Sequence, residues 1–170
     1  YLIEFWLKPA VVALGVPLYL QLEAIKKQLV PILLSQLAGC IIGVVSVVVI
    51  AKLMGAPQEI IYSLAPKSVT TPIAMEVADT LGGIPALTAA VVVCVGLLGS
   101  IIGIKTLKLT RIKSPIAQGL SLGAAAHAVG TSTAMDISSK YGAYASLGLT
   151  LNGIFTALLT PTILRLLGLL

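Results

Sequence analysis

The chain has 170 residues, of which 58% are hydrophobic and only 10% are charged, and its mean hydropathy is +1.07. Soluble domains carry a charge on about a quarter of their residues, so this composition excludes a soluble domain and predicts an integral membrane protein. The sequence lacks the ten-residue segments of alternating apolar and polar residues that are typical of membrane β-barrels, and we therefore expect an all-α helical bundle.

The formal net charge of +5 comes largely from basic residues in two short segments, which are Lys26, Lys27, Lys105, Lys108, Arg111 and Lys113. Basic loops beside apolar segments are typically cytoplasmic. We interpret this charge as a topology signal and expect no nucleic-acid partner. Cys40 and Cys94 lie in apolar runs, where we expect neither a disulfide nor a metal site. No motif predicts a cofactor.

Residues 1–20 are apolar but contain Pro9 and Pro17. Each proline removes a backbone donor and disfavours helix in the residue before it, so we expect a kinked or broken span. The sequence starts with Tyr1 inside this apolar run. We therefore expect a fragment of a longer chain, with residues 1–170 forming a single transmembrane domain.

Three later segments are apolar and long enough to cross a membrane, which takes about 20 helical residues. They are residues 30–51, 84–104 and 143–167. The first follows a polar loop at residues 21–29. Pairs of glycines four residues apart, namely Gly39 with Gly43 and Gly99 with Gly103, give two of these segments a small-residue face. Such faces favour close helix contact, so self-association into a homo-oligomer is a further expectation.

The segment after the second basic loop predicts a helix that breaks. Ser114 followed by proline has the form of an N-cap and first helical position. The next helix is expected over residues 116–129, with Gly119, Gly123 and His127 on one face because they recur every four residues. We expect a break at residues 130–132 and a short helical segment after it.

An internal repeat relates the two halves of the sequence. A shift of 60 residues aligns identical residues, namely Val69, Thr71, Ala74, Met75, Gly82 and Leu87 with Val129, Thr131, Ala134, Met135, Gly142 and Leu147. The repeats extend over about residues 57–104 and 115–167. Internal repeats with interrupted helices are typical of membrane transporters that bind substrate where the two halves meet.

The charge pattern bears on the topology of these repeats. If both basic loops are cytoplasmic, an even number of crossings separates them, and the helices at 30–51 and 84–104 already supply two. Residues 57–83 then form a re-entrant hairpin with its tip near residues 66–71, and the second repeat inserts from the opposite face, giving inverted topology. The alternative is a broken helix that crosses the membrane, which would place four positive charges outside.

The first tip has the chemistry to bind a small carboxylate. Thr71, which precedes a proline, has the form of an N-cap, so the following helix would aim free N–H groups and its positive dipole end at the tip. Ser68, Thr70 and Thr71 add hydroxyl donors, and Lys67 adds a positive charge. In the alternative, purely structural interpretation, the hydroxyls only cap a helix, and Lys67 lies in a surface turn or reaches the lipid headgroups.

The second tip offers similar groups, which are His127, Gly130, Thr131, Ser132 and Thr133. His127 is the only histidine, and it either contributes to the site or bonds a neighbouring helix. Glu76 and Asp136, which the repeat aligns, are candidates for coupling to an ion or proton. They are also placed where a helix dipole alone would stabilise a carboxylate.

An enzyme is the least favoured interpretation. Ser132, His127 and Asp136 supply the residue types of a hydrolytic triad, but nothing resembling a nucleophile elbow surrounds Ser132. We therefore expect no enzymatic activity.

Three segments carry a family resemblance. They are residues 5–21 with Lys-Pro-Ala-Val-Val-Ala-Leu-Gly-Val-Pro-Leu-Tyr, residues 64–83 with Ala-Pro-Lys-Ser-Val-Thr-Thr-Pro-Ile-Ala-Met, and residues 114–135 with Ser-Pro-Ile-Ala-Gln-Gly-Leu and Ala-Ala-His-Ala-Val-Gly-Thr. Together they resemble the LrgB/CidB family over essentially the whole chain. The resemblance implies an antiholin-like membrane protein or murein-hydrolase effector with a small LrgA/CidA-like membrane partner. It also implies a relationship to the plastid glycolate/glycerate translocator and to bacterial proteins linked to pyruvate.

From these observations we expect a transporter of small monocarboxylates such as glycolate, glycerate, pyruvate or lactate, bound between the two tips. The alternative is an antiholin-like regulator of murein hydrolase activity and autolysis without a transport cycle. We expect the bacterial cytoplasmic membrane as its location, or the plastid inner envelope if the protein comes from a plant.

Overall fold

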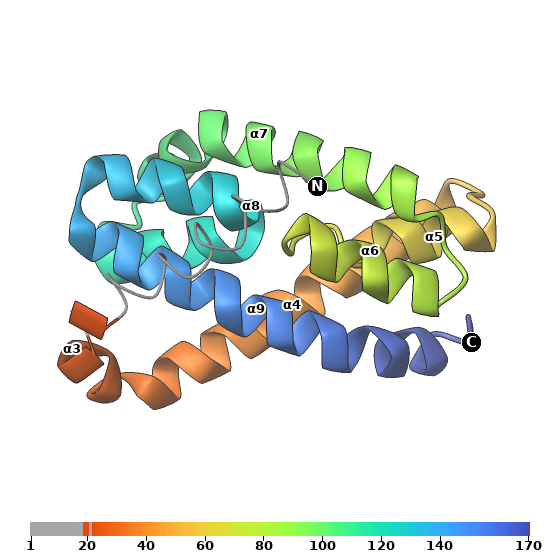
Figure 1. Cartoon of the computed structure of the whole chain (residues 1–170), viewed down its shortest axis with the longest axis horizontal. Coiled ribbons are helices and arrows are strands. Elements are labelled where there is room, and N and C mark those ends of the chain that lie inside the picture. Colours follow the sequence, from red (N-terminus) through yellow and green to blue (C-terminus); the bar gives the residue numbers. More distant parts are fainter. Residues whose placement is uncertain (1–18, 21) are drawn as a thin grey trace, which may run out of the picture.

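The computed structural model describes residues 19–20 and 22–170, and the regular structure in this part of the chain is helical. The kinked span predicted for residues 1–20 lies outside the described residues, apart from its last two. The helices are α3 (Leu22–Lys26), α4 (Leu29–Leu53), α5 (Gln58–Leu64), α6 (Thr71–Thr80), α7 (Pro85–Leu109), α8 (Pro115–Ile137) and α9 (Ser139–Leu166), shown in Figure 1. The all-α prediction is confirmed, although α3 occupies part of the polar segment predicted as a loop.

Among the described residues, three helices are long and apolar enough to cross a membrane, and these are α4, α7 and α9. These candidate spans coincide with the segments predicted at residues 30–51, 84–104 and 143–167. A helix of 25 residues, such as α4 or α7, is about 37 Å long and exceeds the hydrocarbon thickness of about 30 Å. On α7, Leu97, Leu98 and Ile101 are more than half exposed. Such an exposed apolar face is suited to contact with lipid, so the structure is that of a membrane protein with three candidate spans among the described residues.

The spans α4 and α9 run in the same direction (Figure 1). Near their starts Ile32 and Leu147 share an apolar cluster, and farther along Ala51 and Leu164 share another. Cys40 belongs to the second cluster, and its Sγ lies 3.4 Å from Thr156 Oγ1. In each of these three pairs the residues are separated by nearly the same number of positions in the sequence. The two helices therefore lie side by side over most of their length.

A loop of residues 65–70 joins α5 to α6. Val69 is fully buried against Ala74 and Val92, which anchors the loop to α6 and α7. The predicted N-cap is wrong by one residue, because Thr70 holds the N-cap position and Thr71 begins α6. Proline is tolerated throughout the first turn, where backbone N–H groups have no helical partner, so Pro72 fits the second position as well as the first.

The helix α8 breaks at Ala126 and His127, whose backbone angles are φ −123°, ψ 16° and φ 43°, ψ −132°. The break predicted at residues 130–132 is therefore wrong, because those residues are helical. The role of Gly130 is to allow close packing, since a Cβ there would lie 2.5 Å from the Leu122 carbonyl oxygen. Eight residues along a straight helix span about 12 Å, so this contact shows that the second arm of α8 folds back on the first, as Figure 1 also shows.

Ser114 caps the start of α8 as predicted, because its hydroxyl accepts a hydrogen bond from the Ala117 N–H. The glycines on the first arm pack against α9. A Cβ on Gly119 would lie 2.7 Å from the Tyr141 carbonyl oxygen, and one on Gly123 would overlap Ala145. On α7, Gly99 packs against Ala126 and Gly103 against Leu122, which confirms the packing role of that pair.

The glycine pair on α4 behaves differently. No atom of the described chain lies within 4 Å of a Cβ built on Gly39 or Gly43. Both glycines line a cavity instead. Their predicted role in close helix contact is thus not seen between the described helices.

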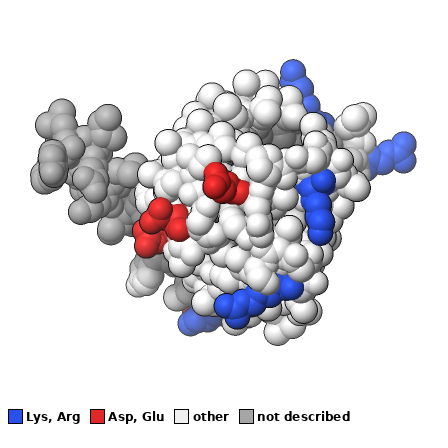
Figure 2. Space-filling view, turned by 90° about the vertical axis from the view of Figure 1, so that its right-hand side faces the viewer, with Lys and Arg blue, Asp and Glu red and all other residues white. Residues whose placement is uncertain are grey.

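The two basic segments lie at the same end of the molecule, where α3 leads into α4 and where α7 ends (Figure 1). Lys140 near the start of α9 adds a further positive charge there. The opposite end carries charges of both signs in separate spots on a mostly uncharged surface (Figure 2). This distribution agrees with a topology in which both basic segments are cytoplasmic.

Candidate functional site

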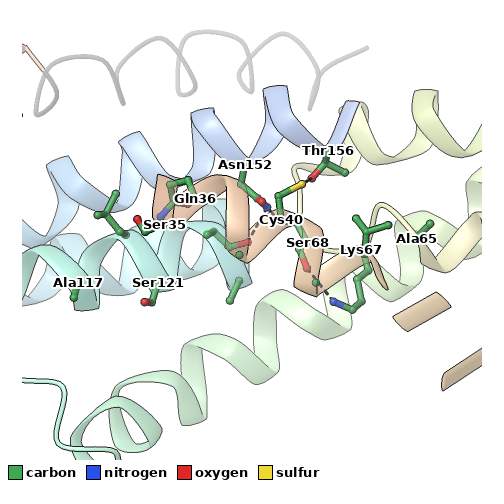
Figure 3. A pocket seen from close by; sticks show the side chains of 16 residues that line it. Ser35, Gln36, Cys40, Ala65, Lys67, Ser68, Ala117, Ser121, Asn152 and Thr156 are labelled. Carbon is green, nitrogen blue, oxygen red and sulfur yellow. Dashed lines mark hydrogen bonds between the residues drawn. The ribbon is translucent and has the colours of Figure 1, made fainter. Parts of the chain in front are cut away.

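A cavity of about 380 Å³ lies between α4, α8, α9 and the loop between α5 and α6. Its polar lining comes from four places in the chain that are distant in sequence (Figure 3). The polar residues are Ser35 and Gln36 of α4, Lys67 and Ser68 of the loop, Ser121 of α8, and Asn152 and Thr156 of α9. The remaining wall is formed by small or apolar residues, namely Gly39, Cys40, Gly43, Val44, Ala65, Ala117, Leu120, Ala124 and Ala125.

Lys67 brings a positive charge to this cavity. Its side chain is half-buried, and its Nζ donates a hydrogen bond to Ser68 Oγ at 3.0 Å. Within the described part of the chain, the only ion pair is between Lys26 and Glu23. The charge of Lys67 is therefore not neutralised by a described carboxylate, and a charge in the interior of a membrane protein is energetically costly.

Asn152 joins the loop to α8. Its Nδ2 donates to the Ser68 carbonyl oxygen at 3.0 Å and to the Ala124 carbonyl oxygen at 2.9 Å. The side chain is only 3% exposed, so both bonds lie in the protein interior. One amide on α9 thus fixes the loop that carries Lys67 next to the last turn of α8 before its break.

The wall formed by α4 consists of residues three or four apart, which lie on one face of the helix. The hydroxyl of Ser35 is occupied by a hydrogen bond of 2.9 Å to the Ile32 carbonyl oxygen. Gln36 is 5% exposed, and its Oε1 has no hydrogen-bond partner. Buried polar atoms are nearly always paired, so this amide is an exception that requires an explanation.

The structure divides the residues predicted at the first tip into two pairs. Lys67 and Ser68 line the cavity. Thr70 and Thr71 are half-buried and form the start of α6, outside the cavity lining. The first tip therefore contributes one charge and one hydroxyl to the cavity, and its threonines belong to the adjoining helix end.

The residues predicted at the second tip lie away from the cavity. His127 is 4% exposed and its Nε2 is 2.8 Å from the Val92 carbonyl oxygen of α7. Thr131 and Thr133 donate to carbonyl oxygens one turn earlier, those of His127 and Val129. Ser132 is exposed, and Gly130 packs against the first arm of α8. The arm before the break, and not the arm after it, supplies the cavity wall.

Glu76 on α6 and Asp136 near the end of α8 are both exposed, and neither lines the cavity. No group of three or more metal-ligating side chains occurs among the residues that were searched, which are the described ones. The structure thus brings neither carboxylate to Lys67.

Sequence reasoning missed the lining residues on the spans, of which Gln36, Asn152 and Thr156 are the most informative. Each lies in an apolar run, where a polar side chain is costly and faces the protein interior or a watery cavity. A search for polar residues inside the predicted spans would have found them. The repeat drew attention to the interrupted segments instead.

Comparison with known proteins finds a match between residues 1–166 and the model of the LrgB-like family. An uncharacterized protein of Bacillus subtilis, YwbG, is 42% identical over 158 residues, which cover 93% of this chain and 70% of the relative. An uncharacterized protein of Haemophilus influenzae is 42% identical over 157 residues, or 92% of this chain and 68% of the relative. The antiholin-like protein LrgB of Bacillus mycoides is 35% identical over 167 residues, or 98% of this chain and 73% of the relative. No solved structure matches the chain significantly.

Proposed function

The chain belongs to the LrgB-like family of membrane proteins, and from that premise we propose that it is a carrier of small monocarboxylates such as glycolate, glycerate, pyruvate or lactate. The observation that carries this proposal is the position of Lys67. Its ammonium group lies at a polar cavity between membrane-spanning helices, without a described carboxylate to neutralise it. A small anion would supply the missing negative charge.

The cavity suits a small substrate. Ligand pockets range from about 300 to 1,000 Å³, and the volume of about 380 Å³ is near the lower limit. Lys67 Nζ and Ser68 Oγ lie together at the loop, so one carboxylate can accept hydrogen bonds from both. The apolar remainder of the lining suits a short carbon chain.

The transport cycle that we infer uses the loop of residues 65–70 and the break in α8 as the tips of two re-entrant units. The 60-residue repeat aligns these regions, and the two basic segments lie at one end of the molecule. The unit α5–α6 connects to the other end through the turn after α4, so the two units enter from opposite faces, as inverted repeats do. Alternating opening of the two units gives the substrate access from each side in turn.

A second candidate function has support from the names of relatives. Several Bacillus relatives are called antiholin-like protein LrgB. In this alternative the protein regulates murein hydrolase activity and autolysis by assembling with a small LrgA/CidA-like membrane protein, without moving a substrate. For both functions we propose such a partner, a homo-oligomer, and the bacterial cytoplasmic membrane as the location, since the relatives named above are bacterial. We propose no enzymatic activity, because the His127 imidazole bonds Val92 and not Ser132.

Uptake by proteoliposomes tests the carrier proposal. Full-length protein, with and without the small partner, is reconstituted and given labelled glycolate, pyruvate or lactate under an imposed proton or sodium gradient. We expect saturable uptake that Lys67→Met abolishes, because the anion then lacks its counter-charge. Lys140→Met is the matched control, since Lys140 is exposed and does not line the cavity.

The outcomes separate the two functions. Uptake by wild-type protein and by the Lys140 variant, but not by the Lys67 variant, supports the carrier and its site. If correctly folded protein moves none of these acids under either gradient, the carrier proposal is refuted and regulation by assembly becomes the better explanation.

A further inference from the structure

Gly39 and Gly43 on α4 differ from the other helical glycines of the described chain, because no described atom packs against them. A Cβ built on either has no described atom within 4 Å, whereas one built on any other helical glycine would lie 3.3 Å or less from such an atom. Glycine is less stable than alanine inside a helix, and close packing of helices offsets that cost at the other positions. Packing within the described chain therefore does not explain these two glycines.

The space beside Gly43 is part of the polar cavity, whose lining includes both glycines. Gly43 is half-buried and Gly39 is exposed, so the space beside Gly43 is the more enclosed of the two. Val44, the next residue on α4, belongs to the same apolar cluster as Ala65 of the loop. Ala65 precedes Lys67 by two positions, and Figure 3 shows both at one end of the cavity. Gly43 therefore lies toward the end of the cavity at which the carboxylate is proposed to bind.

We infer that Gly43 is a specificity-determining residue, whose missing side chain leaves room for the carbon chain of the substrate and so sets the upper limit of substrate size. This inference rests on the proposed carrier function. The lining positions of α4 extend from Ser35 to Val44, which is about 13 Å along a helix. The cavity is thus longer than a two- or three-carbon acid, and its substrate range extends to longer homologues.

The 2-hydroxy acids glycolate, lactate and 2-hydroxybutyrate form a series in which each step adds one carbon to the chain. We measure the initial uptake of each acid by proteoliposomes of the full-length protein at low substrate concentration. For the wild-type protein we expect the uptake of 2-hydroxybutyrate to be similar to that of glycolate. Gly43→Ala places a methyl group in the space that the longer chain needs. We expect it to reduce the uptake of 2-hydroxybutyrate relative to glycolate by about tenfold, the lower limit for one methylene in a closely fitting pocket.

Gly153→Ala is the matched control, because it makes the same substitution in α9 outside the cavity lining. The atom nearest to a Cβ built on Gly153 is the end of the Ile73 side chain, at 3.3 Å. We expect this variant to keep the wild-type uptake ratio. The oligomeric state and thermal stability of the purified variants give a second readout. Gly43→Ala should keep the oligomeric state and be at least as stable as the wild type, because alanine favours a helix and meets no described atom there.

The outcomes separate room for a substrate from contact with another protein chain. A lower ratio in Gly43→Ala, with Gly153→Ala and the oligomeric state unchanged, supports the inference. A changed oligomeric state, or an equal loss of uptake for all three acids, overturns it, because Gly43 then contacts another chain or supports the fold.

An unchanged ratio in Gly43→Ala also overturns the inference, and so does wild-type uptake of 2-hydroxybutyrate that is less than a tenth of glycolate uptake. Both results leave the carrier function intact. The absence of uptake of all three acids by folded wild-type protein refutes the carrier function itself.

Discussion

At His127 we predict that a glycine variant is more stable than an alanine variant, which is the reverse of the order at an ordinary helical position. Its φ of 43° and ψ of −132° fall in a region that is strained for residues with a side chain but accessible to glycine. Such strain costs about 1–3 kcal/mol. Glycine at an ordinary helical position is instead less stable than alanine by about 1 kcal/mol. We therefore expect His127→Gly to be more stable than His127→Ala by about 1–3 kcal/mol.

The comparison isolates the backbone, because both variants lose the imidazole and its contact with the Val92 carbonyl oxygen. Ser132 provides the control, since it is exposed and lies within the helical second arm. There Ser132→Ala should be more stable than Ser132→Gly by about 1 kcal/mol. Unfolding of the purified variants in detergent by heat or by sodium dodecyl sulfate measures both differences. If His127→Ala is the more stable variant by the margin found at Ser132, then α8 does not break at this residue.

Two further predictions concern the hydrogen bonds of Asn152 and the side of the membrane on which the two basic segments lie. Asn152→Leu should lower the free energy of unfolding by about 1–3 kcal/mol, because it leaves the Ser68 and Ala124 carbonyl oxygens without their donor. Thr160→Val loses a hydrogen bond only within its own helix, so it should lower the free energy of unfolding by less than half as much in the same assay. An equal loss would contradict the role of Asn152 in connecting the loop to α8. In a variant lacking Cys40 and Cys94, Gln28→Cys and Leu109→Cys should react with an impermeant maleimide from one side of the membrane and Met54→Cys from the other. Reaction of the first two from opposite sides would refute the placement of both basic segments on one face.

The spans could be predicted from the sequence because they depend on a local property. A run of about 20 apolar residues is stable in hydrocarbon only as a helix, so its length and composition determine α4, α7 and α9. The cap at Ser114 is equally local, since serine followed by proline favours a helix start. Both features depend only on neighbouring residues in the sequence and need no contact with a distant part of the chain.

The break in α8 could not be predicted from its own residues. The segment around Ala126 consists largely of alanine, which has the highest helix propensity, and His127 carries no turn signal. At the break the imidazole contacts the Val92 carbonyl oxygen of α7, and Gly96 of α7 leaves space for the ring. These contacts join residues more than 30 positions apart, so a search of the local sequence cannot find them. The glycine at 130 suggested a break nearby, but it serves to let the two arms pack.

The candidate site was predicted in part for a similar reason. Lys67 and Ser68 stood out because they are polar within an interrupted segment, and both line the cavity. The repeat then predicted an equivalent contribution from Thr131 and its neighbours. That equivalence is not reproduced in the cavity. The break at His127 aligns with Lys67 in the repeat, but the helix resumes directly after His127, so Thr131 lies within the second arm and its hydroxyl bonds back to the His127 carbonyl oxygen. The interruption is thus longer in the first repeat than in the second, and Thr71 begins a helix whereas Thr131 lies inside one.

The walls of the cavity differ in how firmly they are held, and this difference bears on how a substrate would enter. The first arm of α8 packs on α9 through Gly119 and Gly123, whose lack of side chains lets the backbones approach closely. Separating those helices would break many contacts at once. The loop of residues 65–70 is held on its cavity side by the bond from Asn152 to Ser68 and by the packing of Ala65 in the apolar cluster that contains Cys40 and Val44. A single hydrogen bond between membrane helices is worth about 0.6 kcal/mol on average. Opening on the side of α5 and α6 thus costs less than opening on the side of α8, so we expect the loop that carries Lys67 to move first.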